Sequence, residues 1–226
     1  MLTNLTIFGR SKTLMPIFVN YLFITSVKNK GNRREKRIVI FASGNGTNTQ
    51  NVIQYFQQSN IAEVVHVLSN KKHAKVLARA KALNVPGSSF SKTELLSEEH
   101  VLKILKKLEP DLIVLAGFLL KFPEIILREF PNKVLNIHPA LLPKYGGKGM
   151  YGHHVHEAIV ANNETETGIT IHYVNENYDE GAIILQKKTK ISSKDTAEDV
   201  ARKVHQLEYE WLPRVLEDVL INDTVK

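Results

Sequence analysis

The sequence predicts an α/β protein built on a doubly wound, mostly parallel sheet, with an antiparallel strand pair and a long helix at the C-terminal end. Two continuous apolar runs, Arg37–Ala42 and Asp111–Ala116, are typical of parallel strands that are covered on both faces. Segments of helical periodicity alternate with such strands up to His138, which favours βαβ units. Beyond Gly168, two alternating segments indicate antiparallel strands, and a long amphipathic stretch follows them.

The first half of the chain contains five predicted strands separated by helices. Apolar residues at three-to-four spacing, Val52, Ile53 and Phe56, predict a helix that ends near Gln58. Ser97 is expected to begin another helix and Pro110 to stop it. The predicted strands are 37–42, 63–69, 85–89, 111–116 and 134–138, and the later helices are 72–83, 97–108 and 124–130.

The second half begins with a long loop, Pro139–Gly152, which contains four glycines and is expected to form a lid or a binding wall. A helix is predicted over His153–Ala161. Antiparallel strands are predicted over 168–174 and 182–190, with Gly181 in the turn between them. The pair Asp195 and Glu198 is expected to cap the last helix, which Pro213 is expected to kink or divide in two.

Composition limits the classes of function. With 226 residues, 43% of them hydrophobic, the chain can bury one full core. It has no cysteine, which excludes disulfides, thiolate nucleophiles and thiolate metal ligands and favours a reducing compartment such as the cytoplasm. The net charge of +7 suggests nucleic acid, but residues 1–37 hold eight of the 30 basic and one of the 23 acidic residues, so the remainder is neutral. Nucleic-acid binding is therefore not expected.

Residues 1–36 differ from the rest of the chain. Their apolar stretch, 14–27, is short for a membrane span and lacks an A-x-A-like cleavage site for a secretory signal. The preferred interpretation is a non-native or disordered extension, which leaves residues 37–226 as a single domain without membrane contact. A chain that begins near Glu35 is then expected to fold and keep full activity.

The strand Val134–His138 carries the first candidate site residues. Alternation places Asn136 and His138 on the same face, near the carboxyl end of a parallel strand, where open α/β sheets bind ligands. A lone histidine is more often a core residue, but the amide beside it and the glycine-rich loop after it favour an active site. Asp179 lies in the turn between the last two strands, and spacing alone does not show whether it reaches His138.

The glycine turn Ser43–Asn48 joins the first strand to the first helix. Free N–H groups at a helix N-terminus bind anions, and glycine lets the backbone approach a phosphate closely. The spacing of Gly44 and Gly46 fits neither dinucleotide nor nucleoside-triphosphate motifs. Phosphate binding and an ordinary capped turn remain equally open at this point.

A metal site is not expected. His153, His154 and His156 point to different sides of a helix, and no carboxylate or cysteine completes an evident set of ligands. On the last helix His205 and Glu208 are three residues apart and share a face.

Four segments resemble the glycinamide ribonucleotide formyltransferases of purine synthesis. They are S-G-N-G-T-N after the first strand, V-L-A-G-F, N-I-H-P-A-L-L-P-K-Y and Y-D-E-G-A-I-I-L-Q, in the family order over residues 37–220. The resemblance implies formyl transfer from 10-formyltetrahydrofolate to the amine of glycinamide ribonucleotide by a cytoplasmic monomer or homodimer. These partners are small molecules, and the resemblance implies no metal.

The resemblance also implies roles for individual residues. The catalytic group is Asn136, His138 and Asp179. The expected substrate-binding residues are Gly46, Thr47, Asn48, His205, Gln206, Leu207 and Glu208. The expected folate-binding residues are Leu119, Leu120, Lys121, Phe122, Asn136, Asn175, Glu176, Asn177, Tyr178 and Asp179.

These residue types suit the reaction. Negative charge develops on the formyl oxygen, which Asn136 and a protonated His138 can stabilise. His138 titrates in the range needed to move a proton from the amine to the leaving folate nitrogen. Asp179 is expected to raise the pKa of His138.

Two departures concern the folate tail. Leu119–Leu120 replaces the Met-Arg found in many members, with Lys121 one place later, and an arginine expected before the Ser97 helix has no counterpart except nearby Lys92. Methionyl-tRNA formyltransferase, formyltetrahydrofolate deformylase and a non-catalytic nucleotide-binding module are rival interpretations. The short segments outside residues 37–220 and the retained Asn136, His138 and Asp179 disfavour them.

Overall fold

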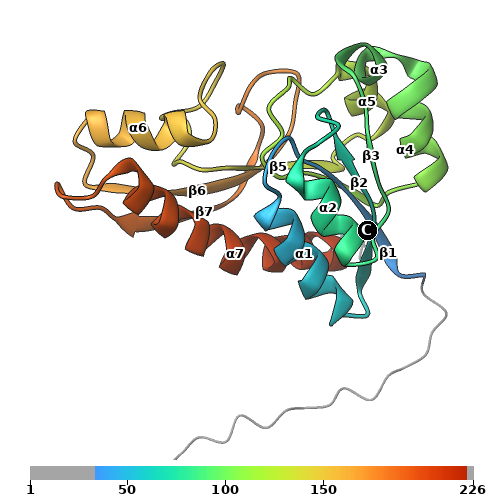
Figure 1. Ribbon diagram of the computed structural model, residues 1–226, viewed down its shortest axis with the longest axis horizontal. Coiled ribbons are helices and arrows are strands. Elements are labelled where there is room, and N and C mark those ends of the chain that lie inside the picture. Colours follow the sequence, from blue (N-terminus) through green and yellow to red (C-terminus); the bar gives the residue numbers. More distant parts are fainter. Residues whose placement is uncertain (1–33, 223–226) are drawn as a thin grey trace, which may run out of the picture. The chain divides into compact units, whose positions relative to one another are not determined.

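The computed structural model describes residues 34–222, and the predicted extension therefore lies outside the described residues except for its last three. The described chain folds around one seven-stranded sheet with the order β3-β2-β1-β4-β5-β6-β7 (Figure 1). The strands are β1 Lys36–Phe41, β2 Ala62–Ser69, β3 Gly87–Ser89, β4 Leu112–Leu115, β5 Val134–His138, β6 Glu166–Tyr173 and β7 Ile183–Lys190.

Helices connect these strands. They are α1 Thr47–Gln57, α2 Lys75–Ala82, α3 Lys92–Leu96, the π-helix η1 Glu98–Leu102, α4 Lys103–Leu108, α5 Glu124–Glu129, α6 His153–Ala161 and α7 Ala197–Asn222. The strands β1 to β5 pair in parallel, and β6 and β7 pair antiparallel. The predicted fold class is therefore confirmed.

Alternation along the central strands divides the core between the two faces of the sheet. In β1, Ile38 and Ile40 belong to the cluster that includes residues of α1, α2 and α7. Val39 and Phe41 belong to the cluster that includes residues of η1, α4 and α5. These two groups of helices lie on opposite sides of the sheet in Figure 1. The central strands are fully buried because both of their faces are covered.

Several predicted elements have different boundaries. The helix predicted over 97–108 is the π-helix η1 followed by α4, and the separate helix α3 precedes it. A capping box in which Ser91 and Glu94 exchange hydrogen bonds begins α3. The helix predicted over 72–83 begins only at Lys75, and the strand predicted over 168–174 begins earlier, at Glu166.

The predictions for the last helix were also wrong in detail. Thr196 and Asp199 form its N-terminal capping contacts in place of Asp195 and Glu198. Asp195 instead accepts a hydrogen bond from the Ser192 N–H and pairs with Lys203. Pro213 does not divide α7, which continues over 26 residues, because packing against the buried core holds the helix on both sides of it.

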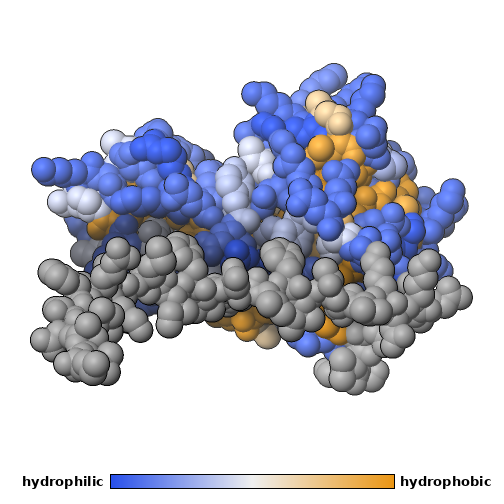
Figure 2. Space-filling model, turned by 90° about the horizontal axis from the view of Figure 1, so that it is seen from below, coloured by the Kyte–Doolittle hydropathy of each residue, from blue (hydrophilic) through white to orange (hydrophobic). Residues whose placement is uncertain are grey.

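Most of the coloured residues in Figure 2 are hydrophilic, and hydrophobic residues gather in smaller areas. Over residues 34–222, no helix is both long and apolar enough to cross a bilayer.

Candidate active site

A cavity of about 650 Å³ opens at the carboxyl ends of β1, β4 and β5. Parallel pairing brings these three ends together at one edge of the sheet, as expected for a ligand site in this architecture. Fifteen of the residues named from the sequence line it: Gly46, Thr47, Asn48, Leu119, Leu120, Lys121, Phe122, Asn136, His138, Asn175, Asn177, Tyr178, Asp179, His205 and Glu208.

Three named residues do not line the cavity: Glu176, Gln206 and Leu207. On α7, His205 and Glu208 share the face toward the cavity, so the two residues between them point elsewhere. Leu207 packs against the core and Gln206 is exposed. Glu176 is exposed in the loop that joins β6 to β7.

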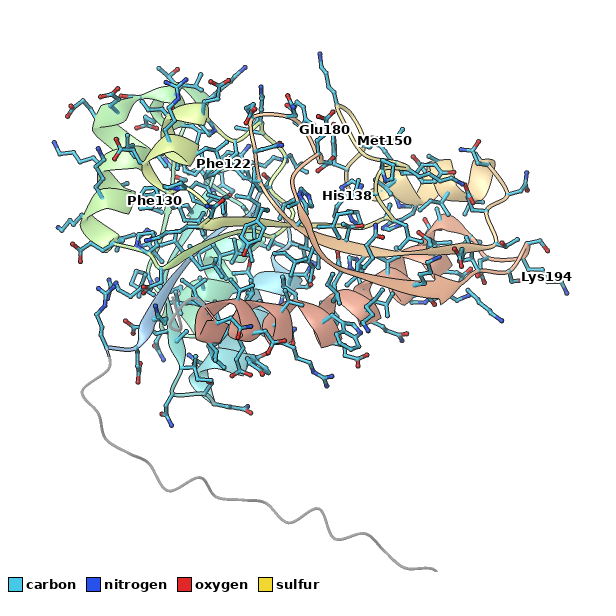
Figure 3. All side chains as sticks on the ribbon, turned by 180° about the vertical axis from the view of Figure 1, so that it is seen from behind. Phe122, Phe130, His138, Met150, Glu180 and Lys194 are labelled. Atoms are coloured by element: carbon cyan, nitrogen blue, oxygen red, sulfur yellow. The ribbon has the colours of Figure 1, made fainter. Side chains whose placement is uncertain are left out.

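His138 lies at the end of β5 and is almost fully buried, below the loops that carry Met150 and Glu180 (Figure 3). Its Nε2 atom donates to the carbonyl oxygen of Tyr145 over 2.7 Å. A carbonyl can only accept, so this contact fixes the ring proton on Nε2. The other ring nitrogen, Nδ1, lies 3.7 Å from Oδ2 of Asp179.

The Asp179 carboxylate acts to raise the pKa of His138, as expected, but the net shift of this pKa is downward. Burial of the imidazole lowers its pKa, whereas the Asp179 carboxylate and the Tyr145 carbonyl raise it, and burial has the larger effect. The pKa of His138 therefore lies below its ordinary value. At neutral pH the ring is an uncharged base whose Nδ1 atom lies beside Asp179, and both residues line the cavity.

Asp179 is held in place from three sides. Its backbone adopts the left-handed conformation, with φ of +56°, in the loop that joins β6 to β7. Oδ2 accepts a hydrogen bond of 2.9 Å from the Gly147 N–H, and Oδ1 lies 3.3 Å from Nδ2 of Asn136. Burial raises the pKa of Asp179, but the nearby His172 and His138 rings and the Gly147 N–H bring it below its ordinary value, so the carboxylate is ionised.

Sequence reasoning missed His172. In the antiparallel pairing of β5 with β6, His172 is the partner of Asn136, and its Nε2 atom lies 3.1 Å from the Asn136 amide nitrogen. Nδ1 of His172 donates to the carbonyl oxygen of Tyr173 over 2.8 Å, so Nε2 is the acceptor in the neutral ring. Both amide hydrogens of Asn136 thus have acceptors, namely His172 and, at the longer distance, Asp179.

The glycine turn forms the opposite wall of the cavity. Gly46 is the N-cap of α1 with φ of +75°, and a Cβ there would lie 2.3 Å from Val76 Cγ2, so only glycine fits. Within the described residues no side chain caps α1, which leaves its first-turn N–H groups directed at the cavity. The guanidinium of Arg79 binds both the backbone and the side-chain oxygen of Asn45 and steadies this turn.

The helices α6 and α7 supply a third group of polar residues. Glu208 is buried and accepts hydrogen bonds from Asn48 Nδ2 at 2.9 Å and from His205 Nδ1 at 2.6 Å. The contact with Glu208 raises the pKa of His205. Beside them, His156 is buried, and burial lowers its pKa to about 4. The Nδ1 atom of His156 has no hydrogen-bond partner among the described residues.

A second hollow of about 570 Å³ continues from the main cavity. The two share the wall Leu119–Phe122 and the ring of Tyr178. Apolar side chains line most of the hollow, and its charged residues are Lys92, Lys121 and Glu124. Among the described residues, no three histidines or carboxylates are gathered as a metal site would need.

A buried histidine–carboxylate pair beside an uncapped helix N-terminus, at the carboxyl edge of a parallel sheet, is typical of an α/β enzyme of acid–base chemistry. The chain belongs to the formyl transferase family, whose model matches residues 36–216.

Two bacterial members of known name are similar to this chain over most of their length. The phosphoribosylglycinamide formyltransferase of Bacillus subtilis is 33% identical over 190 residues, which cover 82% of this chain and 95% of that one. That of Haemophilus influenzae is 37% identical, covering 80% and 85%. The crystal structure of the Bacillus halodurans enzyme of the same name superposes with a TM-score of 0.74 at 34% identity, covering 82% and 95%.

Proposed function

We propose that this protein transfers the formyl group of 10-formyltetrahydrofolate to the amine of glycinamide ribonucleotide, in purine biosynthesis. The observation that carries the proposal is that one cavity holds the His138–Asp179 pair, the Asn136 amide and the uncapped N-terminus of α1. The side chains of His138, Asp179 and Asn136 suit acyl transfer to an amine. The helix N-terminus suits the phosphate of a ribonucleotide.

The uncharged His138 is the proposed base. As the substrate amine forms its bond to the formyl carbon it loses a proton, and Nδ1 of His138 is the ring nitrogen available to take it. The resulting imidazolium faces the Asp179 carboxylate at 3.7 Å. The bond from the formyl carbon to folate N10 then breaks, and the same proton passes to N10. The lowered pKa keeps the ring unprotonated near neutral pH, so it is free to accept the proton, and makes the imidazolium a better acid toward N10. The Asp179 carboxylate offsets the cost of charging the buried ring.

Asn136 is proposed to stabilise the charge on the formyl oxygen. Its two amide hydrogens already have acceptors, so donation to substrate requires that one contact be replaced. The 3.3 Å contact with Asp179 is the longer one and the one that substrate would displace. The charge on Asp179 is then free to interact with the His138 imidazolium.

The two walls of the cavity are proposed to bind different substrates. The N–H groups at Gly46, Thr47 and Asn48 would hold the ribose phosphate, and the dipole of α1 adds to their attraction. Glu208, with His205 beside it, would contact the glycinamide ribonucleotide. The folate pteridine would lie between the segments 119–122 and 175–179.

The proposed reaction needs no metal ion and no covalent intermediate on the protein. The partners are the two small molecules, without nucleic acid or membrane. A monomer or homodimer in the cytoplasm is in accord with the neutral charge of residues 38–226 and the absence of cysteine from the sequence.

A single assay distinguishes the proposal from its rivals. The purified protein is incubated with 10-formyltetrahydrofolate and, in separate reactions, glycinamide ribonucleotide, charged initiator tRNA or buffer alone. We expect formyl transfer to the ribonucleotide and slow release of formate in buffer. Equal folate turnover with and without the ribonucleotide would indicate a hydrolase instead.

A further inference from the structure

The glycine-rich loop between β5 and α6 contacts both members of the catalytic pair through its backbone. The carbonyl of Tyr145 accepts from His138 Nε2 over 2.7 Å. Two residues later, the N–H of Gly147 donates to Asp179 Oδ2 over 2.9 Å. The position of this short segment therefore determines which nitrogen of His138 carries the proton and where Asp179 stands.

The side chains of the same segment are anchored outside the cavity on one carboxylate oxygen. Oε1 of Glu164 accepts from the Tyr145 hydroxyl and from Lys144 Nζ, each over 2.9 Å. Glu164 lies in the turn between α6 and β6, where its own N–H donates to the Ile159 carbonyl over 3.2 Å. The anchor thus belongs to the packed body of the protein.

The backbone of Tyr145 requires such an anchor. Its φ of +57° is in the left-handed region, which a residue with a large side chain rarely adopts without support from its surroundings. Its ring is partly buried against the core, and its hydroxyl ends on Glu164. A hydrogen bond to an ionised acceptor is short and strong, so it can hold this conformation.

The two contacts of Glu164 differ in how much they stabilise the loop. The side chain of Lys144 is 69% exposed, and an exposed ion pair contributes little. The hydrogen bond from the Tyr145 hydroxyl to Glu164 is part-buried, and it holds the residue whose carbonyl contacts His138. The Tyr145 hydroxyl is therefore the contact through which Glu164 acts.

We propose that Glu164 is a positioning residue for His138: through the Tyr145 hydroxyl it holds the Tyr145 carbonyl on Nε2 and keeps Nδ1 free beside Asp179. The kinetic part of this inference rests on the proposed function. The structural part concerns the state of the imidazole and requires no substrate.

Other charged and titratable groups around His138 stay in place when Glu164 changes. They are Asp179 on the β6–β7 loop, His172 on β6, His156 on α6 and Glu208 on α7. Within residues 34–222, none of them forms a hydrogen bond with the Tyr145 hydroxyl or with Glu164. Because the Tyr145 carbonyl raises the pKa of His138, loss of that contact moves the acid limb of kcat/KM to lower pH.

The kinetic test compares four single variants. Glu164→Ala and Tyr145→Phe are each expected to lower kcat about tenfold with KM changed less than about twofold, and to shift the acid limb. Glu164→Gln keeps an oxygen acceptor and is expected to restore most of kcat. Lys144→Met is expected to have nearly the same kcat and KM as the unaltered protein, because the ion pair that it removes is exposed.

Two further variants sharpen the comparison. Because both changes break the same contact, the double variant of Glu164→Ala and Tyr145→Phe is expected to lose no more than either single variant. Glu166→Ala is the matched control. Glu166 is nearby, at the start of β6, and its side chain pairs with Lys188 on the surface.

The substrate-free test uses the ¹⁵N spectrum of the His138 ring. We expect the Nε2–H form in the unaltered protein and in Glu166→Ala, and a mixture of the two tautomers in Glu164→Ala and Tyr145→Phe. An unchanged ring in both variants, or losses in kcat that multiply in the double variant, overturns the inference. A protein that forms no formylated ribonucleotide overturns the proposed function instead, while the spectrum still decides the role of Glu164.

Discussion

Nδ1 of His138 and Oδ2 of Asp179 lie 3.7 Å apart, too far for a direct hydrogen bond and close enough for strong attraction once the ring is charged. The carboxylate therefore does little for the neutral ring that awaits substrate. It acts when the ring has accepted a proton. Burial keeps the ring neutral at rest, and Asp179 stabilises the charge that develops later.

This relationship predicts the effect of Asp179→Asn. The amide preserves the shape and removes the charge, so kcat is expected to fall about a hundredfold to ten-thousandfold with a small change in KM. The kcat of His138→Ala is expected to fall by a similar factor. Steady-state kinetics measure both, and the exposed Asp218→Asn on α7 serves as the control. A kcat for either variant close to normal removes that residue from the mechanism.

The same pair predicts the pH dependence of kcat/KM. The base acts in its neutral form, so the rate is lost as pH falls through the pKa of His138, which burial places below 6.5. The profile is expected to be flat at pH 7 and to bend below 6.5. Because Asp179 raises that pKa, Asp179→Asn should move the bend to lower pH. A bend above pH 6.5 would contradict the neutral-base mechanism.

His156 predicts a loss of stability in acid. Its pKa is about 4 when folded and 6.5 when exposed, so the unfolded chain binds the extra proton first and stability falls from pH 6.5 toward 4. At pH 5 the free energy of unfolding is lower by about 2 kcal/mol, because each pH unit below 6.5 corresponds to roughly 1.4 kcal/mol.

Urea unfolding at pH 7 and pH 5 measures this loss. His156→Gln is expected to lose less stability between the two pH values than the unaltered protein, by about 2 kcal/mol. His73→Gln is the control, because His73 is exposed. Equal losses in both variants would show that His156 does not bind the proton on unfolding.

The central sheet could be predicted from the sequence because its signals are local. The fully apolar runs of β1 and β4 fix two buried parallel strands, and alternation in β5 places Asn136 and His138 on one face. The glycine turn before α1 was also predictable because Gly44 and Gly46 lie directly between a strand and a helix, although the contact of Gly46 with Val76 was not. The position of the cavity at this edge follows from these elements alone.

Contacts between distant segments could not be read in this way. His172 meets Asn136 only through the register of β5 and β6, and a shift of one residue would turn His172 to the other face. The direction of the His138 pKa depends on how deeply the ring is buried, which no motif states. Pro213 predicted a break in α7, but tertiary packing outweighs the lost hydrogen bond.

Asn48 predicts a change in ribonucleotide binding. It lies in the first turn of α1 at the proposed phosphate site, and its amide also holds Glu208. Asn48→Ala is expected to raise KM for glycinamide ribonucleotide about tenfold and to leave KM for the folate unchanged. Asn51→Ala is the matched control on the same helix, where the amide instead binds the Tyr209 carbonyl. An unchanged KM for the ribonucleotide counts against the phosphate site.

The second hollow predicts a preference for anionic folate tails. Lys92 and Lys121 lie beside an apolar surface that continues from the main cavity, and Glu124 is the one acidic residue among the residues that line this hollow. Each lysine attracts the glutamate carboxylates, and together they favour a longer polyglutamate over a single glutamate. Salt weakens this attraction because the groups are close to solvent.

Lys92→Met and Lys121→Met are each expected to raise KM for a triglutamate folate about threefold to tenfold, and KM for the monoglutamate less. Lys107→Met, an exposed change on α4, is the control. Kinetics at low and high salt separate the effect of charge from that of packing. If the lysines act through their charge, the difference in KM between variant and unaltered protein should narrow as salt rises. Equal KM values for the two folates in the unaltered protein would place the tail elsewhere.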